Sequence, residues 1–211
     1  MTTARVVVGA SHAGAELAAR LRQLAPHVPV VMIGDEEILP YQRPPLSKGW
    51  LGDPAAQADA LLIRNAAAYA SAGIEVRSGV RVAAIERDAR RLGLDDGDTL
   101  DYVQLALATG ARPRRLATPD VDRAEQAPNF HYLRALADAA RLRPRLTPGA
   151  RIVVIGGGYI GLELASLAIK RGLQPVVLEA QPRVLARRMN RRPSGFTLLT
   201  VVRAARQNEM N

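Results

Sequence analysis

Residues 151–161 read RIVVIGGGYIG, a β-branched stretch that ends in a glycine-rich turn. Gly156, Gly158 and Gly161 have the spacing G-x-G-x-x-G. In that pattern the first glycine permits a tight turn, the second lets a pyrophosphate approach the backbone, and the third lets a helix pack closely on the strand. Apolar residues then recur at helical spacing, at Ile160, Leu164 and Leu167. The stretch predicts a strand and a helix whose N-terminus holds a dinucleotide.

A second strand is expected at Pro175–Leu178, and it would complete a βαβ unit. Glu179 follows this strand, 18 residues beyond Gly161. A carboxylate at that place accepts hydrogen bonds from a ribose 2′-hydroxyl and repels a 2′-phosphate, so NADH is preferred over NADPH. Arg183 lies close enough in sequence to serve a 2′-phosphate, which leaves NADPH open on the residues alone.

The same design occurs near the start of the chain, where residues 5–14 read RVVVGASHAG. Gly9, Ser11 and Gly14 give G-x-S-x-x-G, a weaker pattern because serine adds a side chain where the ligand should pass. Helical spacing and a second strand follow, at Leu17, Leu21, Leu24 and Val28–Ile33, and an acidic pair comes next, at Asp35 and Glu36. A second dinucleotide-binding βαβ unit is predicted here.

An antiparallel meander is expected between the units, formed by Val80–Ile85, Arg91–Leu94 and Val103–Ala108, and a helix is expected before it, at Leu61–Ala72. The predicted fold class is α/β, with two Rossmann-like FAD/NAD(P)-binding units and the meander between them. We expect an FAD-binding domain over residues 1–111, an NAD(P)-binding domain over 112–186, both incomplete, and an atypical basic tail over 187–211.

The amino-acid composition excludes several classes of protein function. The 211 residues are 48% hydrophobic and 23% charged, as in a globular protein. They contain no cysteine, which excludes disulfide scaffolds, iron–sulfur ligation and dithiol chemistry by this chain, and no metal site is expected. The sequence shows neither an apolar run long enough to cross a bilayer nor a signal-peptide pattern, so we expect a cytoplasmic protein without a membrane partner.

The net charge of +9 is concentrated near the C-terminus, where residues 187–211 hold six arginines and one glutamate. No basic stripe with interleaved aromatic residues accompanies the charge, so we do not expect nucleic acid as a partner.

Four runs in order carry a family resemblance: residues 6–22 (VVVGASHAGAELAARLR), 33–48 (IGDEEILPYQRPPLSK), 105–114 (LALATGARPR) and 153–165 (VVIGGGYIGLELA). Together they resemble the FAD-dependent ferredoxin reductases, the NADH-dependent reductase components of cytochrome P450 and dioxygenase systems. The resemblance extends from residue 5 to about residue 188. It implies FAD on the first unit, NADH on the second, and hydride transfer between them.

The resemblance also assigns residues. FAD is implied to contact Gly9, Ser11, Ala13, Gly14, Asp35, Glu36, Arg43, Lys48, Val82, Thr109, Gly110 and Arg134. NADH is implied to contact Gly156, Gly158, Tyr159, Ile160, Gly161 and Glu179. The catalytic roles fall to Lys48 and Glu163, which are expected to pair near the junction of flavin and nicotinamide.

The chain lacks the redox-active cysteine of thioredoxin- and glutathione-reductase-like flavoenzymes, so electrons are expected to leave singly to a [2Fe-2S] ferredoxin. Nitrite-reductase-like and apoptosis-inducing-factor-like oxidoreductases share the PPLSK loop and stay open. The family also has a C-terminal half that this chain lacks, and we therefore expect a truncated N-terminal portion. The alternative function is a non-catalytic remnant that at most binds a dinucleotide. The oligomeric state is left open.

Overall fold

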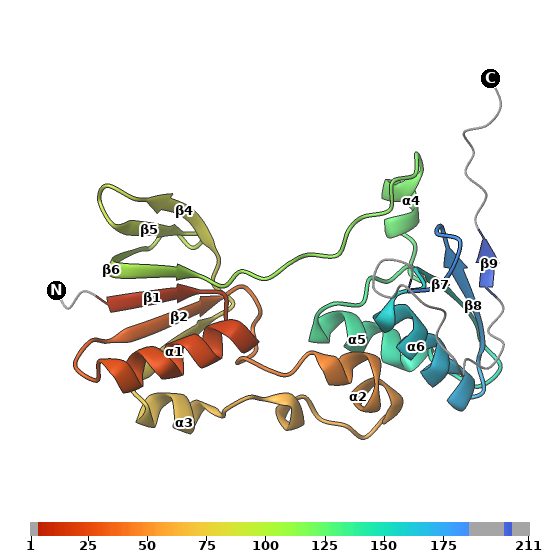
Figure 1. Cartoon of the computed structure of the whole chain (residues 1–211), viewed down its shortest axis with the longest axis horizontal. Helices are drawn as coiled ribbons and strands as arrows, with labels where there is room; N and C mark the ends of the chain where they lie inside the picture. Colours follow the sequence, from red (N-terminus) through yellow and green to blue (C-terminus); the bar gives the residue numbers. More distant parts are fainter. Residues whose placement is uncertain (1–3, 186–200, 204–211) are drawn as a thin grey trace. The chain divides into compact units, whose positions relative to one another are not determined.

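The computed structural model describes residues 4–185 and a short strand at Val201–Arg203 (Figure 1). Two compact units divide the chain. The first contains Met1–Arg43 and Gln57–Arg112, and the second contains Pro44–Ala56 and Pro113–Asn211. The segment Pro44–Ala56 is grouped with the second unit, whereas the domain prediction from sequence kept it in the first.

A mixed six-stranded sheet forms the first unit, in the order β3-β2-β1-β6-β5-β4. Its strands are β1 (Ala4–Val8), β2 (Val30–Gly34), β3 (Ile74–Ser78), β4 (Val82–Glu86), β5 (Arg91–Leu94) and β6 (Thr99–Leu107). Neighbouring strands from β3 to β6 run parallel, and β6, β5 and β4 are antiparallel. The predicted meander is therefore present, but its last strand also extends the parallel sheet.

Each face of this sheet is covered by a different layer. Helix α1 (His12–Leu24) packs on one face, where its Ala15 and Ala18 are buried (Figure 1). On the other face Leu92, Leu94 and Tyr102 of the meander bury side chains of β1 and β2. The sheet is consequently buried on both sides, as its β-branched composition predicted.

Sequence reasoning missed strand β3 and drew the preceding helix too long. Of the expected helix Leu61–Ala72, only the part Ala66–Ser71 is an α-helix, α3, and Leu61 instead ends the 3₁₀ turn η2 (Ala58–Leu61). Helix α3 begins where the Asn65 side chain accepts a 2.9 Å hydrogen bond from the Ala68 N–H. The missed strand alternates apolar and polar residues over positions 74–77, which is itself a strand signal, but the pattern is only four residues long and was overlooked.

The second unit contains the predicted βαβ arrangement. Strand β7 (Arg151–Ile155) leads through helix α6 (Tyr159–Lys170) to the parallel strand β8 (Gln174–Glu179). Strand β9 (Val201–Arg203) adds in parallel to β8 and lies in the region predicted as an atypical tail. The remaining residues of 187–211 lie outside the described part of the chain. The shorter elements of this unit are η1 (Pro44–Ser47), α2 (Gly49–Gly52), α4 (Val121–Glu125), α5 (Leu136–Leu142) and η3 (Arg143–Arg145).

Two arginines hold the segment Pro44–Ala56 within the second unit. The Arg143 guanidinium lies 4.2 Å from the centre of the Trp50 ring and donates a 2.9 Å hydrogen bond to the Ala56 carbonyl. Arg171, at the end of α6, donates to the Leu51 carbonyl at 3.2 Å. Cation–π contacts and hydrogen bonds to backbone carbonyls both stabilise a loop of this kind. They place η1 and α2 beside α6.

In the described part of the chain, none of the helices has the length and apolar character needed to cross a bilayer.

Candidate functional site

The two glycine-rich turns have the same backbone geometry. Gly9 and Gly156 take φ values of +116° and +108°, in the region that favours glycine. A Cβ on Gly14 would lie 1.9 Å from the Gly9 carbonyl oxygen, and one on Gly161 would lie 2.0 Å from the Gly156 carbonyl oxygen. Only glycine permits these approaches, so the first and last glycines of both motifs serve the contact of helix with strand.

The middle glycine of the second motif, Gly158, has a role other than the packing of helix on strand. A Cβ on Gly158 would have no heavy atom within 4 Å, and the φ of Gly158 is −82°, which any residue adopts. Packing within the chain therefore does not explain the glycine. Gly158 is the N-cap of α6 and makes no side-chain capping bond, so the helix presents free N–H groups to open space. These residues fit a pyrophosphate group.

In the first unit the corresponding position is Ser11, the N-cap residue of α1. The Ser11 side chain makes no capping hydrogen bond. His12 and Ala13 follow at the exposed N-terminus of the helix. The hydroxyl thus stands at an open helix end, where it leaves the backbone N–H groups to a ligand. This turn also fits a phosphate group.

Glu179 closes onto the glycine-rich turn of the second unit. Its Oε2 accepts a 2.7 Å hydrogen bond from the Gly157 N–H, and its Oε1 accepts one of 2.8 Å from the Gln181 N–H. Each carboxylate oxygen keeps a further lone pair for a ribose hydroxyl. The hydrogen bond from Gly157 holds the carboxylate against the glycine-rich turn, next to Gly158.

Sequence reasoning missed Gly157, the second of three consecutive glycines. Its carbonyl accepts a 2.9 Å bond from the Leu185 N–H, and a Cβ on it would lie 2.9 Å from Val184 Cγ1. The turn is therefore held between Glu179 and the segment that follows β8. The signal was the run of three glycines, which the G-x-G-x-x-G pattern does not require.

The two acidic candidates after β2, Asp35 and Glu36, lie in different surroundings. Glu36 accepts a 2.6 Å hydrogen bond from the Tyr41 hydroxyl and pairs with Arg43. The Arg43 guanidinium also lies 5.0 Å from the centre of the Tyr41 ring. Asp35 is exposed at the end of the strand. Asp35 is thus the better placed of the two for a ribose, and Arg43 is engaged with the loop that contains it.

The remaining predicted FAD contacts are divided between the units. Thr109 and Gly110 follow β6 in the first unit, where the Thr109 backbone lies close against Gly9. Val82 begins β4 and packs against the core of the same unit. Arg134 precedes α5 in the second unit, and its backbone N–H donates to Asp138 at 3.1 Å.

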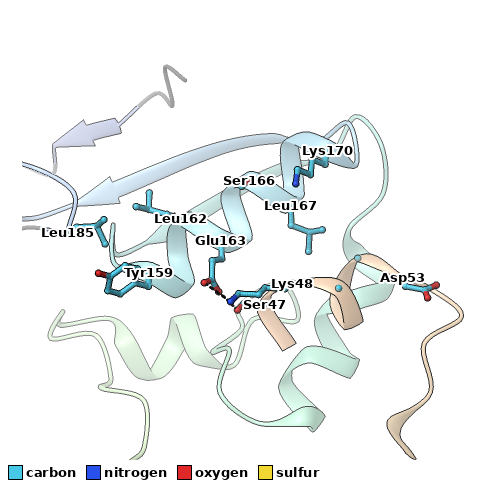
Figure 2. Close-up of a pocket in the computed structure, with 12 residues that line it drawn as sticks. Ser47, Lys48, Asp53, Tyr159, Leu162, Glu163, Ser166, Leu167, Lys170 and Leu185 are labelled. Atoms are coloured by element: carbon cyan, nitrogen blue, oxygen red, sulfur yellow. Dashed lines mark hydrogen bonds and ion pairs between the residues drawn. The ribbon is translucent and has the colours of Figure 1, made fainter. Parts of the chain in front are cut away.

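Lys48 and Glu163 meet in the second unit, as the resemblance implied. The Lys48 ammonium lies 3.3 Å from Glu163 Oε1, and the Ser47 hydroxyl donates a 2.5 Å hydrogen bond to Glu163 Oε2 (Figure 2). Glu163 projects from the second turn of α6, while Ser47 and Lys48 join η1 to α2. The structure brings the charged pair together, and the catalytic role of the pair stays a prediction. Ser47 was not predicted as a site residue.

A cavity of about 820 Å³ adjoins this pair. It is lined by Ser47, Lys48, Gly49, Gly52, Asp53, Tyr159, Leu162, Glu163, Ser166, Leu167, Lys170 and Leu185 (Figure 2). Its walls are largely apolar, and its few charged groups include the Lys48–Glu163 pair. Tyr159 stands at the cavity with 55% of its surface exposed, and Ile160 beside it is 49% exposed. Such a site suits a flat, partly apolar ring with polar edges.

Within residues 4–185, the structure contains no group of three or more histidine, aspartate or glutamate side chains that could hold a metal ion.

Comparison with known proteins finds a matching family model and several similar reductases. The family model described as "Pyridine nucleotide-disulphide oxidoreductase" matches residues 3–198. The anthranilate 1,2-dioxygenase system ferredoxin–NAD(+) reductase component of Burkholderia cepacia is 42% identical over 95% of this chain and 51% of its own length. Rhodocoxin reductase of Rhodococcus erythropolis is 40% identical over 90% of this chain and 44% of its own length.

Solved structures of such reductases are also similar to this chain. The crystal structure of the covalent putidaredoxin reductase–putidaredoxin complex superposes with a TM-score of 0.80 at 43% identity, covering 88% of this chain and 44% of that one. The chain spans about half the length of the curated relatives it matches. The two Rossmann-like units predicted from sequence are confirmed by this likeness of fold.

Proposed function

Because the chain belongs to the pyridine nucleotide-disulphide oxidoreductase family, we propose that it provides the nucleotide-binding units of an NADH-dependent, FAD-containing ferredoxin reductase. Relatives of this chain are named as ferredoxin reductase components of dioxygenase systems and as putidaredoxin reductase. The observation that carries the proposal is the Lys48–Glu163 pair, held beside the open glycine-rich turn of α6. When bound, FAD accepts a hydride from NADH and releases electrons singly to a [2Fe-2S] ferredoxin.

The first unit would hold FAD. Its open turn at Gly9 and Ser11 would take the pyrophosphate, and Asp35 would take the adenosine ribose. Thr109 and Gly110 would line the cofactor where the chain leaves β6. Glu36 and Arg43 were expected to contact FAD, but their side chains pair with each other. In this proposal the pair stabilises the loop that contains Arg43 instead.

The second unit would hold NADH. Gly158 and the N-terminus of α6 would receive its pyrophosphate, while Gly156 and Gly161 shape the turn, and Glu179 would receive its ribose. Tyr159 and Ile160 would cover the ligand at the cavity. Lys48 would keep a positive charge at the edge of the reacting rings, with Glu163 as its counter-charge. The apolar cavity wall would exclude water from that edge.

Glu179→Gln is expected to weaken NADH binding about tenfold and to reduce the preference for NADH over NADPH. The glutamine oxygen can accept from only one of the Gly157 and Gln181 N–H groups, and the charge that repels a 2′-phosphate is lost. Calorimetric titration with each nucleotide measures both effects. Glu37→Gln, an exposed glutamate of the first unit, is the matched control and should change neither affinity. An unaltered nucleotide preference in Glu179→Gln would refute the role of Glu179.

A steady-state assay tests the proposed activity. The FAD-loaded chain is mixed with NADH and an artificial electron acceptor, and then with a [2Fe-2S] ferredoxin. The proposal predicts NADH oxidation that depends on FAD and on Lys48. The proposal also places the protein in the cytoplasm, where NADH is available, and cell fractionation checks this location.

A second candidate, nucleotide binding without turnover, is favoured by one observation. In β1 of the first unit Val6 is 1% exposed, because the meander covers it. In β7 of the second unit Val153, which like Val6 lies three residues before the first glycine of the turn, is 59% exposed, and Ile155 is 56% exposed. Bare apolar surface on a sheet weakens a domain and promotes association. Absence of NADH oxidation with retained NADH binding would select this candidate.

A further inference from the structure

We propose that Ser47 is a positioning residue, whose hydroxyl holds the Glu163 carboxylate and thereby sets the position of the Lys48 ammonium. This inference rests on the proposed function and deepens it, because it explains how the charged pair is kept in place. The evidence is the 2.5 Å hydrogen bond from Ser47 Oγ to Glu163 Oε2 (Figure 2).

Burial of Ser47 requires a partner for its hydroxyl. Ser47 is 6% exposed, and it is the sole buried polar or charged residue within the described part of the chain. An unpaired buried hydroxyl costs free energy, whereas a short bond to a carboxylate is among the stronger ones that proteins form. The other acceptor within reach, the Pro44 carbonyl, lies at 3.5 Å. The single hydroxyl proton is therefore directed to Glu163.

The two oxygens of Glu163 have separate tasks. Oε2 is held by Ser47, and Oε1 faces the Lys48 ammonium at 3.3 Å. The Lys48 side chain is 56% exposed, and an exposed ion pair by itself orders a lysine weakly. With one oxygen fixed, the carboxylate plane can no longer rotate freely, so the other oxygen offers the lysine a single stable position.

The location of Ser47 is itself fixed by packing. Leu46 before it is 3% exposed and Leu51 after it is fully buried, and Arg171 donates to the Leu51 carbonyl. Glu163 follows the glycine-rich turn on α6 by one helical turn. Ser47 thus links the segment that carries Lys48 to the helix whose N-terminus would hold the nicotinamide dinucleotide.

Lysine reactivity provides a direct test, because the chain has two lysines, Lys48 and Lys170, and both line the same cavity. The full-length 211-residue chain is treated with a trace of acetic anhydride at one pH. Mass spectrometry of peptides then gives the ratio of acetylation at Lys48 to acetylation at Lys170, which serves as the internal reference. Thermal unfolding of each variant verifies that it is folded.

Ser47→Ala is expected to raise this ratio about two- to fivefold, the fold-change that corresponds to loss of a partly exposed ion pair. Glu163→Gln removes the pair itself and should raise the ratio at least as much. In the double variant the effect should equal that of Glu163→Gln alone, since Ser47 acts through Glu163. Ser71→Ala removes an exposed hydroxyl from the first unit and should leave the ratio unchanged.

Two outcomes would overturn the inference: an unchanged ratio in Ser47→Ala while Glu163→Gln raises it, or full additivity of the two substitutions. The labelling requires neither FAD nor NADH. Failure of NADH oxidation with the expected labelling would therefore reject the proposed function and leave the positioning contact standing.

Discussion

Gly158→Ala is expected to weaken NADH binding at least about tenfold, because a methyl group would occupy the space where the backbone must meet the pyrophosphate. The fold should survive, since a Cβ at this position meets no heavy atom within 4 Å and φ is unstrained. Alanine is a poorer N-cap than glycine, so we expect a loss of unfolding free energy of up to about 1 kcal/mol. Calorimetric titration with NADH and chemical denaturation measure the two quantities.

Gly161→Ala is the matched comparison in the same motif. Its Cβ would lie 2.0 Å from the Gly156 carbonyl oxygen, so helix and strand must separate. Overpacking of this kind should lower the free energy of unfolding by about 3 kcal/mol. The two glycines thus separate binding from folding. Equal loss of stability in both variants, or unchanged NADH affinity in Gly158→Ala, would contradict the assignment of Gly158 to the ligand.

Lys48→Met is expected to slow NADH-driven reduction of bound FAD about 10²-fold, the usual effect of removing one preorganised charged donor from a reaction centre. Methionine keeps an apolar side chain of similar length and removes the charge that faces Glu163. Rapid mixing of the FAD-loaded chain with NADH, followed through the flavin absorption, measures the rate. Saturating NADH separates this effect from binding.

Lys170→Met is the control, because Lys170 lines the same cavity at the end of α6 and lies outside the charged pair. Its reduction rate should match that of the unaltered chain. Glu163→Gln should slow reduction less than Lys48→Met does, since Lys48 keeps its own charge. Equal rates in Lys48→Met and Lys170→Met would show that Lys48 takes no part in hydride transfer.

Much of the fold could be predicted because it rests on local patterns. The runs VVVG at 6–9 and VVIG at 153–156 are β-branched strands that end in a glycine turn, and each predicts a βαβ unit by itself. The meander was predicted from the short stretches Val80–Ile85, Arg91–Leu94 and Val103–Ala108, and β4, β5 and β6 pair antiparallel in that order. Residues 74–77 of strand β3 also alternate apolar and polar, but a pattern of only four residues between two glycines was overlooked.

The site was predictable where it depends on motifs and unpredictable where it depends on packing. Pairing of Lys48 with Glu163 came from the family resemblance, and no spacing rule links two residues so distant in sequence. Ser47 was missed because a serine in a proline-rich loop shows no sign of burial. Arg43 was expected to reach the flavin, yet its partner Glu36 could be identified only once the loop was folded back toward β2.

Anaerobic addition of NADH to the chain reconstituted with FAD shows whether FAD on the first unit is reduced by NADH on the second, with Lys48 at the point of transfer. We expect the chain to acquire a visible flavin spectrum and NADH to bleach it in the absence of oxygen. A folded chain that binds NADH but takes up no FAD, or a bound flavin that NADH fails to bleach, would contradict the account.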